Sequence, residues 1–326
     1  MRSIFRDFSG DFFPVLTYPR EKWPDFWVEY KRKHPRTLEE YSRKHSLSPD
    51  EEIEKLMSHS RKTFDSLYLA WVKDIRRLKS AVLEEIGQLR EQLEIEREDF
   101  VIHLVCSLGI DETMFIRTDK GHVVMIDPVY IWKNSDLEEL PRIIGNATIE
   151  FRKYSEVLVT GEIGSEAKAR RLNVLLEQIR EVVTRDSSGQ LLSEIVWLLD
   201  HYVDYYHWTG FYLSGKSETL HLDAYVGEPT EHTTIPFGSG ICGQAANTKK
   251  TFLVPDVSTE SNYLSCSPKT KSEIVLPIIH HDEVLGELDI DSHNTDAFDE
   301  LDESFLSSVC ELVVPAVLAR LSAADY

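Results

Sequence analysis

The chain has 326 residues, of which 42% are hydrophobic and 28% charged, so it is long enough for two packed domains and too apolar to be disordered throughout. Its formal net charge of −20 opposes contact with phosphate backbones and anionic lipids, and we therefore expect neither nucleic acid nor a membrane as a partner. The sequence shows no run of about 18 apolar residues and no signal peptide pattern, which predicts a cytoplasmic protein.

The four cysteines are too few to form a disulfide framework in a chain of this length. No CxxC pair occurs, and no histidine stands at ligand spacing from another, so we expect no structural zinc site and no bound cofactor. Cys106 lies in an apolar strand pattern and Cys310 among the apolar residues of a C-terminal helix. Cys106 is predicted to be a buried, inert thiol and Cys310 a core residue. The other two, Cys242 and Cys266, lie in less regular segments.

Residues 1–160 are predicted to form a helix-rich mixed domain. The aromatic residues at positions 23–30 predict a short helix whose aromatic face covers a neighbouring core. Ser48 and Glu51 have the spacing of a capping box, with Pro49 at the first helical position.

An amphipathic helix follows that capping box to about residue 97, either as one helix or as two with a break. Its apolar stripe could form a coiled-coil dimer seam or a face packed on its own domain. The aromatic residues Phe64, Tyr68 and Trp71 favour the second alternative, because they suit a broad core better than a narrow seam.

The pattern changes at Phe100. The segments FVIHLVCSL, TMFIRT and HVVMID predict strands, with a hairpin turn at residues 119–121. A helix is expected from about residue 136 to 158, capped by Asn134 or Ser135. Two glycines among small polar residues at 160–165 predict a domain boundary. No metalloprotease motif, phosphate-binding glycine loop or nucleophile elbow occurs here, so the N-terminal sequence indicates no function.

Residues 168–326 are predicted to form a second domain of the α+β class. Two helical stripes lead into the strand patterns TGFYLS, ETLHLDAYV, TFLVPDV, SEIVLPII and EVLGELDID, with a glycine-rich turn and short helix at 238–247 and a final helix from about 302 to 321. Helices on either side of a mostly antiparallel sheet fit this order better than a parallel-sheet fold does.

Five motifs of this domain occur in the order and spacing of one family. They are WTGFY at 208–212, IPFGSGICG at 235–243, LVPDV at 253–257, SEIVLPI at 272–278 and GELDIDS at 286–292. Together with a cysteine at 266, they resemble the free methionine-(R)-sulfoxide reductases, which are single-domain GAF proteins. The resemblance covers somewhat under half of the chain and implies an antiparallel sheet flanked by helices.

The resemblance implies that Cys266 is the nucleophile. In such chemistry a thiolate attacks the sulfoxide sulfur and is left as a sulfenic acid, which a second thiol converts into a disulfide. Thioredoxin or another dithiol then acts as the external reductant. Cys266 lies in a polar loop in which Lys269 and Lys271 would favour the thiolate.

The family's carboxylates correspond to Glu273, Asp289 and Asp291. Such groups can hold the ammonium group of a small zwitterion, and one with a raised pKa can protonate the sulfoxide oxygen. Asp289 and Asp291 are two apart on a strand and so share a face, although a solvated strand end is the alternative. Trp208 and Tyr212 correspond to an aromatic wall around the S-methyl group.

The sequence departs from the family at the resolving cysteine, three residues before the IPFG motif, where His232 stands. Cys242 matches a second family cysteine. Three interpretations stay open: Cys242 resolves Cys266, an external thiol does so, or turnover is lost and the pocket binds a ligand. His232 could also lower the pKa of Cys266, although a surface histidine is the more common outcome.

Two further functions compete with the reductase. One is a sensor in which the pocket binds an amino-acid-like ligand and residues 1–160 carry the output. The other is a redox switch, in which Cys242 and Cys266 form a reversible disulfide. A homodimer is expected for any of them, from the long amphipathic helix together with the GAF-type domain.

Overall fold

The computed structural model describes residues 5–92, 100–118, 121–186, 189–215, 217–260 and 269–323. The chain divides into two compact units, Met1–Ser155 and Glu156–Tyr326, which are described separately. The glycine-containing segment 160–165 therefore belongs to the second unit.

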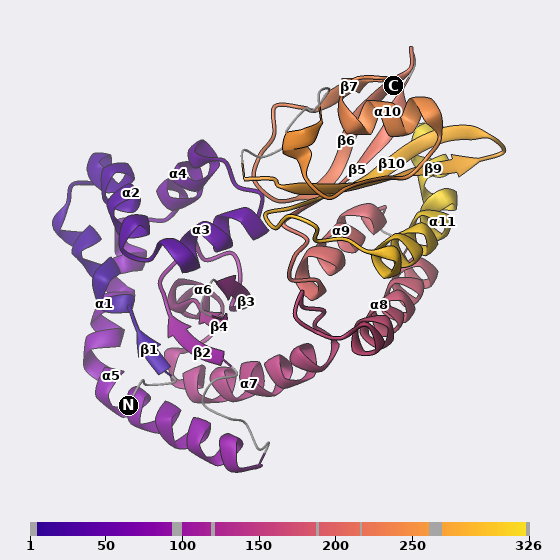
Figure 1. The fold of residues 1–326 in the computed structure, drawn as a ribbon. Helices are drawn as coiled ribbons and strands as arrows, with labels where there is room; N and C mark the ends of the chain where they lie inside the picture. The colour runs from indigo at the N-terminus through magenta and orange to yellow at the C-terminus, as the bar shows by residue number, and fades with distance from the viewer. Residues whose placement is uncertain are drawn as a thin grey trace. The chain divides into compact units, whose positions relative to one another are not determined.

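The N-terminal unit contains a four-stranded sheet of order β1-β2-β4-β3 (Figure 1). Strand β2 pairs in parallel with both β1 and β4, whereas β3 pairs antiparallel with β4. The turn residues Asp119 and Lys120 lie outside the described residues. The strands are β1 (Phe5–Asp7), β2 (Phe100–Leu104), β3 (Thr113–Thr118) and β4 (Gly121–Ile126).

Helices that pack aromatic side chains together make up most of this unit. The expected capping box at Ser48 is present, and the long amphipathic stretch is two helices that separate after Ser58. The ring of Phe64 contacts those of Phe12 and Trp23, so this part of the apolar stripe packs on its own unit, the alternative that the aromatic residues favoured. The helices are α1 (Ser9–Phe12), α2 (Trp23–Lys33), α3 (Pro35–Lys44), α4 (Pro49–Ser58), α5 (Arg61–Gln92), α6 (Pro128–Asn134) and α7 (Leu140–Val157), with 3-10 turns at Phe13–Thr17, Arg20–Lys22 and Leu137–Glu139.

The helix cap predicted at Asn134 or Ser135 is wrong, because Asp136 is the capping residue. Asp136 accepts a hydrogen bond from the Glu138 amide and caps the 3-10 turn that precedes α7. Asn134 instead ends α6, where its side-chain amide donates to the Tyr130 carbonyl. An aspartate competes well for a capping position because its carboxylate accepts from an unpaired amide at the helix start.

Asp127 is a buried carboxylate that organises the end of β4. It accepts hydrogen bonds from the Ser107 amide and hydroxyl and from the amides of Gly109 and Val129, the last of which caps α6. Burial raises its pKa to about 6, and these hydrogen bonds oppose part of that rise. The neighbouring Cys106 is fully buried as predicted, and burial raises the pKa of its thiol, in keeping with the expected lack of reactivity.

We expect Asp127 to make the N-terminal unit less stable as the pH rises from 4 to 7. A carboxyl group with a folded pKa of about 6 and an ordinary value of 3.8 favours the folded state below the lower value. That contribution, about 3 kcal/mol for such a difference, is lost as the pH rises through 6.

Urea unfolding of the wild type and of Asp127→Asn at several pH values tests this. The gap between the two proteins should change by about 3 kcal/mol, whereas parallel curves would contradict the assignment. The exposed capping residue Asp136, changed to asparagine, is the control.

The C-terminal unit is built on a six-stranded sheet of order β7-β6-β5-β10-β9-β8, in which all neighbouring strands are antiparallel. The α+β class and the antiparallel sheet are confirmed. The sequence analysis did not identify β7, which is only three residues long. The strands are β5 (Trp208–Gly215), β6 (Thr219–Val226), β7 (Thr234–Pro236), β8 (Phe252–Val254), β9 (Ser272–His280) and β10 (Glu283–Ser292).

The two faces of this sheet have different partners (Figure 1). Side chains of α8 (Ser165–Arg185), α9 (Leu191–Tyr202) and α11 (Glu300–Ala323) form one apolar cluster with the sheet, and Cys310 is buried in it as predicted. The short helix α10 (Gly240–Thr248) contributes to a second, smaller cluster on the other face.

Helix α11 is long and apolar enough to cross a membrane by length and composition alone. Five of its apolar side chains are nevertheless buried against the sheet in the larger cluster, which explains its hydropathy as that of a core helix. They are Phe305, Leu306, Val309, Val313 and Val317.

A buried polar network ties the start of α11 to α8. Asp302 is fully buried and accepts hydrogen bonds from Lys168 Nζ at 2.6 Å and from the hydroxyls of Tyr205 and Tyr206 at 2.6 and 2.9 Å. Removing the carboxylate leaves both tyrosine hydroxyls without this acceptor and leaves Lys168 with Asp299 alone, at 2.9 Å, and a buried donor without an acceptor is costly.

The variant Asp302→Ala should therefore destabilise the C-terminal unit by about 3 kcal/mol, because it breaks a buried ion pair from one side. Glu300→Ala, an exposed change in the same first turn of α11, should cost less than about 1 kcal/mol. Urea unfolding measures both. Equal effects of the two substitutions would show that the Asp302 network is not stabilising.

Candidate functional site

Three acidic side chains lie on one face of β10. Glu287, Asp289 and Asp291 alternate with Leu288 and Ile290, which belong to the apolar cluster on the helix-covered face. The three acidic residues are at most 1% exposed. The alternative of a solvated strand end is therefore wrong, and the predicted common face of Asp289 and Asp291 is confirmed.

A fourth carboxyl group joins them from the neighbouring strand. Glu273 of β9 stands directly opposite Asp291 in the antiparallel register and is 3% exposed. Directly paired residues of neighbouring strands project to the same side of the sheet, so the four carboxyl groups form one buried cluster. We call Glu273, Glu287, Asp289 and Asp291 the carboxyl cluster.

The glycine-rich turn before α10 brings Cys242 to this cluster. Gly238 and Gly240 have positive φ angles of 86° and 66°, which glycine adopts without strain. A side chain at Gly243 would meet the Pro236 carbonyl oxygen at 2.4 Å, so only glycine lets α10 lie so close to β7. These glycines fix the position of the first turn of α10, which carries Cys242.

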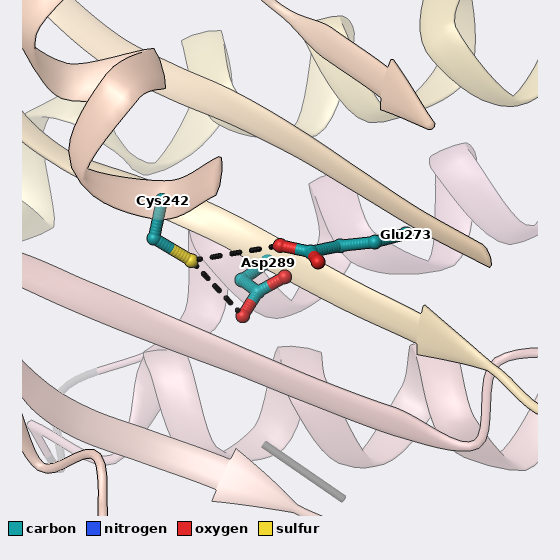
Figure 2. Close-up of side chains that lie close together, drawn as sticks. All are labelled: Cys242, Glu273 and Asp289. Atoms are coloured by element: carbon teal, nitrogen blue, oxygen red, sulfur yellow. Dashed lines mark hydrogen bonds between the residues drawn. The ribbon is translucent and has the colours of Figure 1, made fainter. Parts of the chain in front are cut away.

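The Cys242 thiol points at two of the four carboxyl groups (Figure 2). Its Sγ lies 3.3 Å from Asp289 Oδ2 and 3.8 Å from Glu273 Oε1, both within reach of an S–H donor. Cys242 is only 5% exposed. The sequence prediction that Cys242, Glu273 and Asp289 belong to one site agrees with this geometry.

Two aromatic residues of β5 line the same face. Trp208 and Tyr212 pair with Asp291 and Glu287 of β10, and both are buried. Between them stands Gly210, where a side chain would meet the Trp208 ring at 2.4 Å, so the glycine leaves space for that ring beside Asp289. The indole N–H of Trp208 donates to the Glu228 carbonyl at 3.1 Å, which fixes the ring.

Burial and mutual repulsion keep these carboxyl groups from ionising together. Burial, followed by the charges of Asp289, Asp291 and Glu287, raises the pKa of Glu273 well above its ordinary value. The pKa values of Glu287 and Asp291 are raised well above the ordinary range by burial and then by the charge of Asp289.

Three of these carboxyl groups have no cationic partner among the residues that the structure describes. Glu273, Glu287 and Asp291 form no ion pair with any residue within the described ranges. Each also has a carboxyl oxygen without a hydrogen-bond partner among those residues. Buried carboxylates without partners are costly, so the cluster is suited to bind a cationic group, to hold protons that it can donate, or both.

Other predicted residues are not brought into this cluster by the described structure. Cys266 lies outside the described residues, so its relation to Cys242 stays a prediction. His232 lies between β6 and β7, and its backbone carbonyl accepts a hydrogen bond from the Tyr212 hydroxyl at 2.8 Å. Lys269, expected to favour a Cys266 thiolate, forms an ion pair with Glu228 at 2.5 Å.

The sequence reasoning missed Glu287. The signal was present, because the GELDID motif places this residue two positions before Asp289, on the same face of the strand. Register pairs it with Tyr212 on one side and Pro277 on the other. Because the Glu287 side chain is 0% exposed between these two strands, it is part of the site.

Comparison with known proteins identifies a match in the C-terminal half. The model of the GAF domain matches residues 176–317. The chain is 35% identical over 153 residues to GAF domain-containing protein A of Dictyostelium discoideum, an alignment that covers 47% of this chain and 96% of that protein.

A second relative is the free methionine-R-sulfoxide reductase of Saccharomyces cerevisiae. It is 43% identical over 110 residues, covering 33% of this chain and 61% of the yeast protein. Among solved structures, free methionine-R-sulfoxide reductase from Neisseria meningitidis in complex with its substrate is 32% identical, with a TM-score of 0.45, and covers 48% of this chain and 94% of that one. These similarities lie in the half that carries the carboxyl cluster.

Proposed function

The chain belongs to the GAF domain family through its C-terminal half, and we propose that this half reduces free methionine-R-sulfoxide to methionine with a dithiol as the electron donor. The observation that carries the proposal is the carboxyl cluster beside Cys242, buried on the face lined by Trp208 and Tyr212. The identity with the yeast reductase adds support from outside the structure.

In the proposed reaction, the Cys266 thiolate bonds to the sulfoxide sulfur, and the sulfoxide oxygen takes up a proton. The resulting hydroxyl group passes from the methionine sulfur to Cys266 Sγ as the bond between the two sulfurs breaks, so that methionine leaves reduced and Cys266 is oxidised to a sulfenic acid. A thiol then condenses with the sulfenic acid, releasing water and forming a disulfide. An external dithiol of the thioredoxin type reduces that disulfide and restores the thiol.

The carboxyl cluster would supply both charge and protons. Burial and neighbouring charges raise the pKa values of Glu273 and Asp291, which favours their protonated forms, so either could donate a proton to the departing oxygen. An ionised carboxylate in the same cluster would hold the ammonium group of the amino acid. Trp208 would contact the S-methyl group, as methyl and sulfur groups pack well on aromatic rings.

Resolution of Cys266 is proposed to use an external thiol directly. A resolving cysteine must reach its thiolate form to attack. The Cys242 thiol instead donates its hydrogen to carboxyl oxygens of Asp289 and Glu273, at 3.3 and 3.8 Å. His232 carries no thiol. Cys242 is therefore better suited to position Asp289 than to resolve Cys266.

The proposal is tested by comparing free methionine-R-sulfoxide with its N-acetyl form under excess dithiothreitol. The free amino acid should be reduced, and the acetylated one at least about 100-fold more slowly, because its nitrogen is no longer a cation for the cluster to bind. Similar rates for both would contradict recognition of the ammonium group. No rate for either would contradict the reductase itself.

A sensor module is the second candidate, favoured by His232 at the position of the resolving cysteine. In that case the same pocket binds an amino-acid-like ligand without turnover. Methionine or its sulfoxides should then raise the melting temperature of the wild type and of Cys266→Ser alike, as expected for a ligand that binds only the folded state. No shift with any of these ligands would count against the sensor.

A further inference from the structure

The side chains of Cys242, Glu273 and Asp289 lie close enough together to share one metal ion, an arrangement that the proposed reductase does not need. One atom from each, a sulfur and two carboxyl oxygens, lies within 4.8 Å of the other two, and all three residues are buried. In a tetrahedral zinc site with Zn–S near 2.3 Å and Zn–O near 2.0–2.2 Å, a sulfur and an oxygen ligand are about 3.5 Å apart. The observed Sγ–O distances of 3.3 and 3.8 Å bracket that value.

Glu287 is an independent sign that a cation belongs here. Its side chain is 0% exposed, and neither carboxyl oxygen has a hydrogen-bond partner among the described residues. It projects from β10 on the same face as Asp289, and the nearby Cys242 thiol opposes part of the pKa rise caused by burial. A fully buried carboxyl group that no described N–H or O–H group satisfies, on the same face as Asp289, is poorly explained by packing alone.

The donor set selects the kind of ion. Calcium takes six to eight oxygen ligands, and magnesium keeps an octahedron of oxygens and waters, so neither favours a site with a cysteine sulfur. A thiolate combined with carboxylates suits the borderline-soft divalent ions, of which zinc is the common example. The three residues come from α10, β9 and β10, so no local spacing motif could reveal them.

We propose that Cys242, Glu273 and Asp289 form a binding site for a divalent transition-metal ion such as zinc, with Glu287 as a fourth carboxyl group beside it. Binding removes the proton from the Cys242 thiol, because the metal ligand is the thiolate, and that proton is released to solvent. A bound ion also occupies the carboxylates that are proposed to hold the substrate's ammonium group. That competition, unlike the site itself, rests on the proposed function.

The site is tested with cobalt(II) and zinc(II) added to the reduced, full-length protein. Cobalt should give a near-ultraviolet band from thiolate-to-metal charge transfer at one equivalent, and zinc should abolish it by displacing cobalt. Competition with a chromophoric chelator measures the zinc affinity. Cys242→Ser should remove the band and weaken zinc binding at least 100-fold, while Glu273→Gln should weaken it by 10-fold or more.

Two matched controls locate the ion. Cys310→Ser and Cys266→Ser should both retain the band, because neither cysteine is among the proposed ligands. A band that persists in Cys242→Ser, or that is lost in Cys266→Ser, would overturn the assignment, as would its absence from the wild type. Since none of these measurements depends on methionine sulfoxide, failure of the metal site is distinguishable from failure of the reductase.

Discussion

Replacing Cys266 with serine should lower turnover of free methionine-R-sulfoxide by at least about 1,000-fold, since a serine hydroxyl is a far weaker nucleophile toward sulfur than a thiolate. The assay is methionine formation with excess dithiothreitol, which makes any resolving cysteine unnecessary. The expected loss is therefore in the chemical step itself, and it should appear in kcat.

Two other cysteines provide controls for that substitution. Cys310 is buried in the apolar cluster between the sheet and α11, on the face opposite the carboxyl cluster, so Cys310→Ser should retain activity wherever it folds. Cys242→Ser should reduce the rate less than Cys266→Ser does. A Cys266→Ser protein with activity near that of the wild type would exclude Cys266 as the nucleophile and make Cys242 the next candidate for that role.

The second large effect is expected from Asp289→Asn, which should lower kcat/KM about 100-fold or more by removing charge from the site that binds and protonates the substrate. The same change should make the protein more stable, by about 1 kcal/mol or more. The reason is that the charge of Asp289 raises the pKa values of Glu273, Glu287 and Asp291, so its removal relieves repulsion in a buried site.

Opposite signs for activity and stability distinguish this account from general damage. The control is Glu283→Gln on the same strand, where the side chain is exposed and both quantities should stay unchanged. Steady-state kinetics and thermal melts of the two variants measure the effects. A fall in the melting temperature of Asp289→Asn, or a loss of activity under tenfold, would count against the carboxyl cluster as the reactive site.

Much of the C-terminal unit could be predicted because local patterns and tertiary structure agree there. Alternation in GELDID places Asp289 and Asp291 on one face, and the glycines before Cys242 predict the turn that opens α10. In the N-terminal unit, the capping box at Ser48 correctly indicated the start of α4, because capping depends on residues close in sequence.

What the sequence could not provide was the pairing of distant segments. The approach of Cys242 to Glu273 depends on the register of β9 against β10 and on how closely α10 packs, and no spacing along the chain encodes those distances. Glu287 was overlooked for a related reason. Only the burial of both neighbouring strands distinguishes it from an ordinary exposed glutamate on an antiparallel strand.

The most direct test of the central claim is the formation of methionine from free methionine-R-sulfoxide by the purified full-length chain with dithiothreitol, run beside the same reaction with a thioredoxin system. The account predicts catalytic turnover with dithiothreitol and methionine produced in many-fold excess over protein. Turnover with thioredoxin as well would mean that an external dithiol reaches Cys266 despite His232. No methionine formation with excess dithiothreitol would contradict the reductase and leave the GAF domain as a ligand-binding module.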